Sequence, residues 1–361
     1  MGAPVERATR FPVERRIFPE LYPERAKAIY HMATMTRLTA ELSAEIIGEF
    51  TPVPEGQKLS DRRKKTRSKI LDSLAAEKFE EYLAGLDFIV DSAGSEGLKE
   101  LHKMGEAMRV VLGEHGRGEK KLTIVNDVVE GTTAAAHNRP GAISVLAAST
   151  YGGLFPTPEN VNYMEKFFAP PKVKGEVDIK RPIEENLEVV RSAYGIPAGE
   201  IIVFVMNPKD RPTNQRIADG IAHFGARIIA LDAGDLVPSF LAVSGPEYNK
   251  TGVFLVAGRG GFEEGVIGAA AGKALGGHVE GRLWIPNPED KKFPVPNLPY
   301  LSEKQLVPGR VDQTFVTFTT ITDDPWFGIP GVQIPNGTMT SHSMLIDNTG
   351  ISITPQTSEI K

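Results

Sequence analysis

The segment 126–133, which reads Asn-Asp-Val-Val-Glu-Gly-Thr-Thr, combines acidic, glycine and hydroxyl residues directly after a strand-like apolar run. Asp127 and Glu130 put two carboxylates near one strand end, and carboxylate oxygens are ligands that a hard cation such as Mg²⁺ prefers. Gly131 and Thr132 add backbone N–H groups and a hydroxyl, which suit a phosphate. The alternative is a plain helix start, with Thr or Asp as the N-cap and an acidic first turn.

A second segment, 258–265, reads Gly-Arg-Gly-Gly-Phe-Glu-Glu-Gly and follows another apolar run. It does not match the dinucleotide fingerprint G-x-G-x-x-G, because Glu263 stands where the last glycine belongs. A Walker A loop is excluded as well, since Ala274 follows Gly272-Lys273. Glu264 could supply a metal ligand from a second strand end, where open parallel sheets bind their ligands. Alternatively, the two glutamates only complement the positive end of a helix.

Two other groups of residues are weaker candidates. The basic run 62–67 could meet a phosphate, although such runs are usually solvated faces. The seven histidines include no H-x-x-x-H or H-x-H pair, so we do not expect a histidine metal site.

The composition limits the classes of protein to consider. The 361 residues carry a net charge of −5, which provides no basic field for nucleic acid or an acidic membrane. The chain has no cysteine, which excludes a disulfide scaffold, a thiolate nucleophile and a sulfur-based metal site. It has no run of about 18 apolar residues and begins without a recognisable leader. We therefore expect a soluble, cytoplasmic α/β protein that binds neither nucleic acid nor a membrane.

The elements that must position these segments follow from the spacing of apolar residues. Helices are predicted over 24–50, 66–86, 184–194, 213–224 and 263–275, and strands over 88–90, 122–125, 142–147, 201–205, 227–231, 253–257, 313–318 and 343–346. In the middle of the chain, strands alternate with helices, which is typical of βαβ units in a largely parallel layer.

We divide the chain into three parts on this basis. Residues 24–182 form an α+β part that carries the Asp127–Thr132 motif, and residues 183–300 form an α/β part that contributes Glu264. Residues 301–361 are C-terminal strands that pack back on the body, while the proline-rich stretch 286–300 is an exposed loop.

Taken together, these segments resemble the class II (GlpX-type) fructose-1,6-bisphosphatase family, within the wider lithium-sensitive phosphatase superfamily. Residues 127–132 resemble that family's Asp-Pro-x-Glu-Gly-Thr metal motif, with Val128 in place of proline. Residues 163–166, Tyr-Met-Glu-Lys, are similar to its next tetrapeptide, and 260–266 resemble its Gly-Gly-x-x-Glu-Gly-Val segment. Matching segments at 281–284, 319–323 and 340–343 follow in the same order, so the resemblance covers roughly residues 30–350.

The resemblance implies a layered sugar-phosphatase fold and a metal-dependent phosphomonoesterase, homo-oligomeric, that acts on a sugar phosphate or a related small phosphate. It implies Mg²⁺ or Mn²⁺ as the cofactor, held by Asp127, Glu130 and Glu264. Thr132, together with Asp127, would be catalytic by positioning and activating the attacking water. The implied substrate-binding residues are Gly131, Thr133, Tyr163, Lys166, Arg211, Asp235, Gly260 and Gly261.

The first half of the family's metal site differs in this chain. Where the family has Asp-Gly-x-Ala, residues 66–69 read Thr-Arg-Ser-Lys, or Asp72-Ser73 if the alignment slips. Where it has Gly-Glu-Gly-Glu, residues 90–94 read Val-Asp-Ser-Ala-Gly, which leaves Asp91, or Glu96 further on, as a ligand. Two alternatives therefore stay open: a nucleotide or cyclitol-phosphate phosphatase, and a phosphosugar-binding protein or non-hydrolytic enzyme that has lost part of the metal site.

The family's phosphate-binding stretch, Asp-Arg-Pro-Arg-His, also differs. Arg211 is retained, but Thr213 and Asn214 replace the second arginine and the histidine. Because threonine offers a single neutral hydroxyl in place of a guanidinium, we expect the remote phosphate of fructose 1,6-bisphosphate to be held poorly, and a different substrate to be preferred. Alternatively, Lys209, Arg216 or the 62–67 run replaces the lost arginine.

Overall fold

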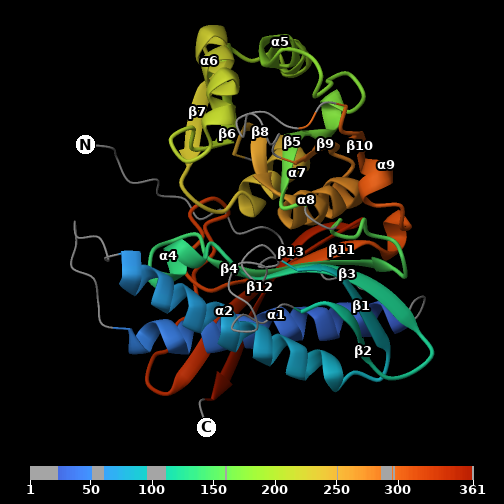
Figure 1. The fold of residues 1–361 in the computed structure, drawn as a ribbon, viewed down its shortest axis with the longest axis vertical. Helices are drawn as coiled ribbons and strands as arrows, with labels where there is room; N and C mark the ends of the chain where they lie inside the picture. The colour runs from blue at the N-terminus through green and yellow to red at the C-terminus, as the bar shows by residue number, and fades with distance from the viewer. Residues whose placement is uncertain are drawn as a thin grey trace.

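The computed structural model describes residues 23–50, 61–95, 111–158, 161–249, 251–285, 295 and 297–359. Within them, the strands form two mixed sheets that lie between layers of helices (Figure 1). The predicted α/β class is therefore confirmed. Most of the proline-rich stretch and Glu96 fall outside the described residues.

Sheet A is the larger sheet and carries the Asp127–Thr132 motif at the end of one strand. It contains β1 (Ile89–Ser95), β2 (Gly113–Gly116), β3 (Lys121–Glu130), β4 (Ile143–Thr150), β11 (Phe315–Thr320), β12 (Thr338–Asp347) and β13 (Gly350–Glu359), in the order β13-β12-β11-β4-β3-β1-β2. β1 and β3 are parallel, whereas the other neighbouring pairs are antiparallel. The C-terminal strands extend sheet A next to β4.

Two long helices cover the outer face of sheet A (Figure 1). They are α1 (Pro23–Glu49) and α2 (Asp61–Ala84), which confirms the helices predicted there, although α2 begins earlier. Met32 and Met35 of α1 pack with Leu71 and Phe79 of α2 in one core cluster, because apolar residues at helical spacing share a face.

Sheet B is the smaller sheet and differs from the sequence expectation. It contains β5 (Tyr163–Ala169), β6 (Ile201–Met206), β7 (Arg227–Leu231), β8 (Val253–Gly261), β9 (His278–Trp284) and β10 (Tyr300–Ser302), in the order β10-β9-β5-β8-β6-β7. β6 is parallel to β7 and β8, which confirms the parallel layer expected for these three strands. β5, β9 and β10, which were not predicted as strands, pair in antiparallel fashion. The sequence pattern does not reveal β5, because Glu165 and Lys166 interrupt its apolar run.

Two helices fill the space between the sheets, and two more cover the far side of sheet B (Figure 1). The inner pair is α7 (Leu236–Asn249) and α8 (Phe262–Leu275), and the outer pair is α5 (Ile183–Tyr194) and α6 (Gln215–Phe224). A Cβ on Gly268 would lie 2.5 Å from the ring of Phe168, so glycine lets α8 approach sheet B closely. The apolar pattern does not predict α7, in which Gly245 is non-helical and is followed by Pro246.

Candidate active site

The Asp127–Thr132 motif sits at an irregular strand end. The pairing of β3 with β4 shifts its register between Asp127 and Glu130, and both carboxylates are buried. Gly131 then adopts φ 78° and forms the N-cap of α4 (Thr132–Ala136), with no side-chain cap hydrogen bond. A Cβ on Gly131 would lie 2.7 Å from the carbonyl oxygen of Gly141, so this turn requires glycine. The alternative in which Thr or Asp caps the helix is therefore wrong.

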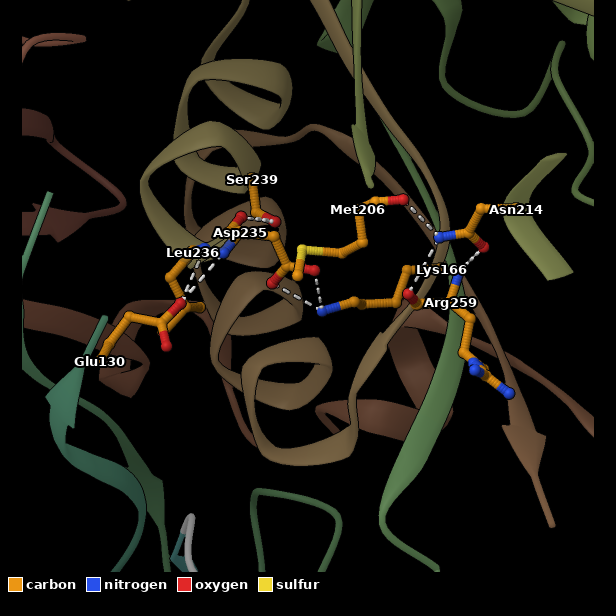
Figure 2. A network of polar contacts seen from close by, with 8 residues as sticks. All are labelled: Glu130, Lys166, Met206, Asn214, Asp235, Leu236, Ser239 and Arg259. Carbon is orange, nitrogen blue, oxygen red and sulfur yellow. Dashed lines mark hydrogen bonds and ion pairs between the residues drawn. The ribbon is translucent and has the colours of Figure 1, made fainter. Parts of the chain in front are cut away.

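Glu130 joins this strand end to the start of α7. Its Oε1 accepts the backbone N–H groups of Asp235 at 3.0 Å and Leu236 at 3.4 Å (Figure 2). Burial and the negative charge of Asp235 raise the pKa of Glu130, while hydrogen bonding with Asp127 and the charge of Lys166 oppose that rise. Glu130 therefore sits in contact with a second carboxyl group and next to a buried cation.

That cation, Lys166 of β5, forms a buried ion pair with Asp235. Its Nζ donates to Asp235 Oδ1 at 2.8 Å and lies 2.7 Å from Oδ2, and its side chain is 0% exposed (Figure 2). Burial disfavours the ammonium, but the charges of Asp235, Glu264 and Glu130 outweigh it and raise the pKa of Lys166. Lys166 is therefore held as a cation among three carboxylates.

A pocket of about 60 Å³ opens beside this ion pair. It is lined by Tyr163, Met206, Arg211, Gly234, Asp235, Gly260, Gly261 and Glu264. A Cβ on Gly260 would lie 2.3 Å from Asp235 Oδ2, and one on Gly261 would lie 1.8 Å from Glu264 Oε2, so both glycines keep this space open. Glu263 instead accepts a hydrogen bond from Thr157 at 3.0 Å, away from the pocket lining.

Most residues predicted from the sequence thus border one region. Tyr163, Arg211, Asp235, Gly260, Gly261 and Glu264 line the pocket, and Asp127, Glu130, Gly131, Thr132 and Thr133 lie in the adjoining strand end and first turn of α4. Gly234 and Met206 are additions; Gly234 has φ 70°, and a Cβ there would lie 3.4 Å from Glu130 Oε1. Their roles in substrate or metal binding remain predictions.

Thr132 connects the motif to α2. Its hydroxyl lies 2.8 Å from the carbonyl oxygen of Val129 and 3.2 Å from Asp72 Oδ1. Asp72 is the shifted alternative at the family's Asp-Gly-x-Ala position, and the structure places it at the motif. Arg67, one turn earlier, donates to the carbonyl of Ala136 at 3.2 Å, at the end of α4.

Asp91 is not brought to this site. It pairs with Thr123 of β3, which precedes Asp127 by four residues, or roughly 13 Å at about 3.3 Å per residue. The hydroxyl of Thr123 lies 3.5 Å from Asp91 Oδ2. This register keeps Asp91 apart from Asp127, and its role as a metal ligand stays a prediction.

Two of the predicted metal ligands, Asp127 and Glu130, lie close enough together to suit a cation. Asp127 and Glu130 are in hydrogen-bond contact, and a proton or a cation between two carboxyl groups so close relieves their repulsion. No group of three or more His, Asp or Glu side chains arranged to hold a metal is found among the described residues. The convergence of Asp127, Glu130 and Glu264 on one cation therefore stays a prediction.

A larger cavity of about 460 Å³ lies between α1 and the start of β3, away from these carboxylates. Its cations are already neutralised, because Arg25 pairs with Asp347 at 2.7 Å, Lys121 with Glu114 at 2.9 Å, and Lys27 with Asp87. Its size alone does not make it the active site, since it lacks the acidic and glycine residues of the smaller pocket.

No helix in the described part of the chain is long and apolar enough to span a membrane.

A family model described as bacterial fructose-1,6-bisphosphatase, glpX-encoded, matches residues 65–355.

Among relatives, the D-fructose 1,6-bisphosphatase class 2/sedoheptulose 1,7-bisphosphatase of Prochlorococcus marinus (strain MIT 9303) is 35% identical over 209 residues, which are 54% of this chain and 60% of the relative. The protein of the same name from Synechococcus sp. (strain CC9605) is 36% identical over 200 residues, or 51% of this chain and 57% of the relative. The chain thus aligns with less than two thirds of the length of these relatives. Because the family model spans most of the sequence, the chain belongs to the GlpX-type fructose-1,6-bisphosphatase family.

Proposed function

We propose that this protein is a metal-dependent phosphomonoesterase that acts on a sugar phosphate or a related small phosphate. The observation that carries the proposal is the hydrogen bond from the N–H of Asp235 to Glu130. Through it, the Asp127–Thr132 motif adjoins the pocket that contains Glu264, although the two segments are far apart in the sequence. The names of the relatives, which specify two sugar bisphosphates, support this substrate class.

In this proposal, Asp127, Glu130 and Glu264 hold Mg²⁺ or Mn²⁺. When bound, such a cation binds phosphoryl oxygens and stabilises the charge that develops on them. The cytoplasmic location, the homo-oligomer and the lithium-sensitive superfamily fold implied by the resemblance belong to the same proposal, and the layered α/β arrangement supports the last of these.

The chain's own side chains then orient water and substrate. The Thr132 hydroxyl has one hydrogen to donate, to Val129 or to Asp72, so its lone pairs are left to accept a hydrogen bond from the attacking water. Asp72, whose Oδ1 lies 3.2 Å from that hydroxyl, would accept the proton that this water loses. Lys166 holds Asp235 at the wall of the pocket.

We further propose that the contacts to the remote end of the substrate differ from those of the family's Asp-Arg-Pro-Arg-His stretch. The Thr213 side chain is short and its hydroxyl is buried, whereas Asn214 is engaged with the backbone of β8. Neither residue can supply the charge of an arginine.

A phosphosugar-binding protein without hydrolysis is the second candidate. It is favoured by Lys166, whose ammonium already lies among the carboxylates of Asp235, Glu264 and Glu130. Phosphate release from a panel of sugar phosphates and nucleotides, with Mg²⁺, with Mn²⁺ and with EDTA, separates the two. Metal-dependent release supports the phosphatase, and tight binding without any release supports the binding protein.

A further inference from the structure

Two arginines meet at one aromatic ring beside the pocket. The guanidinium carbon of Arg211 lies 5.4 Å from the ring centre of Tyr163, and that of Arg259 lies 5.2 Å from the same centre. Arg259 also packs over Trp284 at 4.9 Å. Stacking on aromatic faces fixes the planes of the two guanidinium groups but does not neutralise their charge.

No carboxylate forms an ion pair with either arginine among the residues that the structure describes. Arg211 donates to the carbonyl of Asp210 at 3.2 Å. The Nε atoms of both arginines are buried and have no hydrogen-bond partner in the described part of the chain. Burial and the nearby charge of Arg211 lower the pKa of Arg259. Two like charges held this close are stabilised when an oxyanion binds both.

The backbone that carries Arg259 is fixed by Asn214. The N–H of Arg259 donates to Asn214 Oδ1 at 2.7 Å, and Asn214 Nδ2 donates back to the carbonyl of Arg259 at 3.3 Å and to that of Met206 at 3.0 Å (Figure 2). Gly258 makes this approach possible, since it has φ +112° and a Cβ there would lie 2.8 Å from Asn214 Oδ1. Asn214 is therefore a positioning residue for Arg259.

We propose that Arg211 and Arg259 bind a second oxyanion of the substrate, a phosphate or a carboxylate, at the end remote from the scissile phosphate. The proposal rests on the proposed function, because Arg211 and Tyr163 line the same pocket as Glu264. It also replaces the expectation that a bisphosphate is poorly held, because Arg259 of β8 supplies the positive charge that Thr213 lacks. Arg259 is not itself in the lining but packs on Tyr163, which is. Lys209 and Arg216, which were considered for this role, are exposed and do not line the pocket.

The test compares kcat/KM for fructose 1,6-bisphosphate, 6-phosphogluconate and fructose 6-phosphate in wild type, Arg259→Gln and Arg259→Lys. Arg227→Gln, an exposed arginine on β7, is the matched control. In Arg259→Gln, the preference for a substrate with two oxyanions over the monophosphate should fall by about 10–150-fold, the loss typical of a charged hydrogen bond. Arg259→Lys keeps the charge but not the paired N–H donors of a guanidinium, so it should lose part of this preference. Arg227→Gln should keep the preference. If both arginine-259 variants keep it, the proposal is wrong.

A binding measurement separates this proposal from the phosphatase proposal. Titration calorimetry in EDTA gives the affinity of wild type and Arg259→Gln for the same three compounds. If wild type releases no phosphate but binds a two-oxyanion compound in a manner that needs Arg259, the phosphatase proposal fails and the oxyanion site stands. If wild type is a metal-dependent phosphatase with equal affinity for compounds with one and with two oxyanion groups, the oxyanion site is overturned. Asn214→Ala gives a second variant, in which KM for the two-oxyanion substrate should rise with little change in kcat.

Discussion

The backbone N–H of Asp235 donates a hydrogen bond to Oε1 of Glu130 at 3.0 Å, although the two residues are 105 positions apart. The bond ties the end of β3 in sheet A to the start of α7, where Asp235 also receives the ammonium of Lys166. The motif and the pocket therefore share one buried polar network. Removing a charge from this network should affect both the strand end of sheet A and the pocket.

The buried Lys166–Asp235 pair gives the first prediction. Lys166→Met should lower the free energy of unfolding by about 3–5 kcal/mol, because it leaves the carboxylates of Asp235 and Glu130 buried without their cation. The double variant Lys166→Met/Asp235→Leu should recover part of that loss. Urea unfolding without added metal measures both.

The control is Arg191→Gln, which breaks the exposed Arg191–Glu188 pair and should leave the urea midpoint unchanged. A Lys166→Met protein as stable as this control would show that the buried pair does not hold the network together.

The second prediction concerns Thr132 and Asp72. Thr132→Ala should reduce turnover by roughly 10²-fold and Thr132→Ser should retain most of it, if the hydroxyl orients the attacking water. Since Gly131 is the N-cap of α4, Thr132→Ala should cost only the hydrogen bond of its hydroxyl, about 0.5–1.5 kcal/mol, and Thr132→Ser should keep that bond. Thermal melting and turnover measured on the same samples check both statements.

Asp72→Asn should act through the same hydroxyl, which lies 3.2 Å from Asp72 Oδ1. The double variant Thr132→Ala/Asp72→Asn should then be hardly slower than the slower single variant. Losses that multiply would mean that the two residues act independently.

The third prediction is a pH dependence of stability. Burial raises the pKa of Asp324 to about 6. Hydrogen bonds from the backbone N–H groups of Phe327 and Trp326 favour its charged form and only partly oppose this rise. Because the folded state binds this proton more tightly than the unfolded state, the stability it adds is present below the unfolded pKa and is lost as pH rises through about 6.

Asp324→Asn cannot titrate, so the difference between wild type and this variant isolates the group. From pH 5 to pH 7.5, the free energy of unfolding of wild type should fall relative to that of the variant by about 1.4 kcal/mol, a value that follows from the two pKa values. A difference that stays constant with pH would contradict the raised pKa.

Local patterns predicted the elements whose apolar residues follow one period. α1, α2, α5 and α6 are where the apolar spacing placed them, because each buries one stripe of its surface. α8 was also predicted, but it is buried almost all round because it lies between the two sheets. β5 and α7 were not predicted, because their stability depends on partners distant in the sequence: Lys166 is neutralised by Asp235, and Pro246 follows a kink at Gly245.

The same limit applies to the site. Residue types and spacing identified the acidic strand end and Glu264, but sequence alone does not show which turn of α2 faces Thr132, so Asp72 was only an alternative to residues 66–69. Arg259 was not among the predicted site residues, because its packing with Arg211 on one ring exists only in the folded sheet.

The most direct test of the account is phosphate release from sugar phosphates by wild type, Glu264→Gln and Glu263→Gln, each with Mg²⁺ and with excess EDTA. Glu263 is the matched control, since it is next to Glu264 in α8 but bonds to Thr157 away from the pocket. The account predicts release by wild type and Glu263→Gln with Mg²⁺, none with EDTA, and a loss of roughly 10²-fold or more in Glu264→Gln, the scale for one essential charge-stabilising group. Release that persists in EDTA, or that is equal in the two glutamine variants, would contradict a metal-dependent phosphatase built on Glu264.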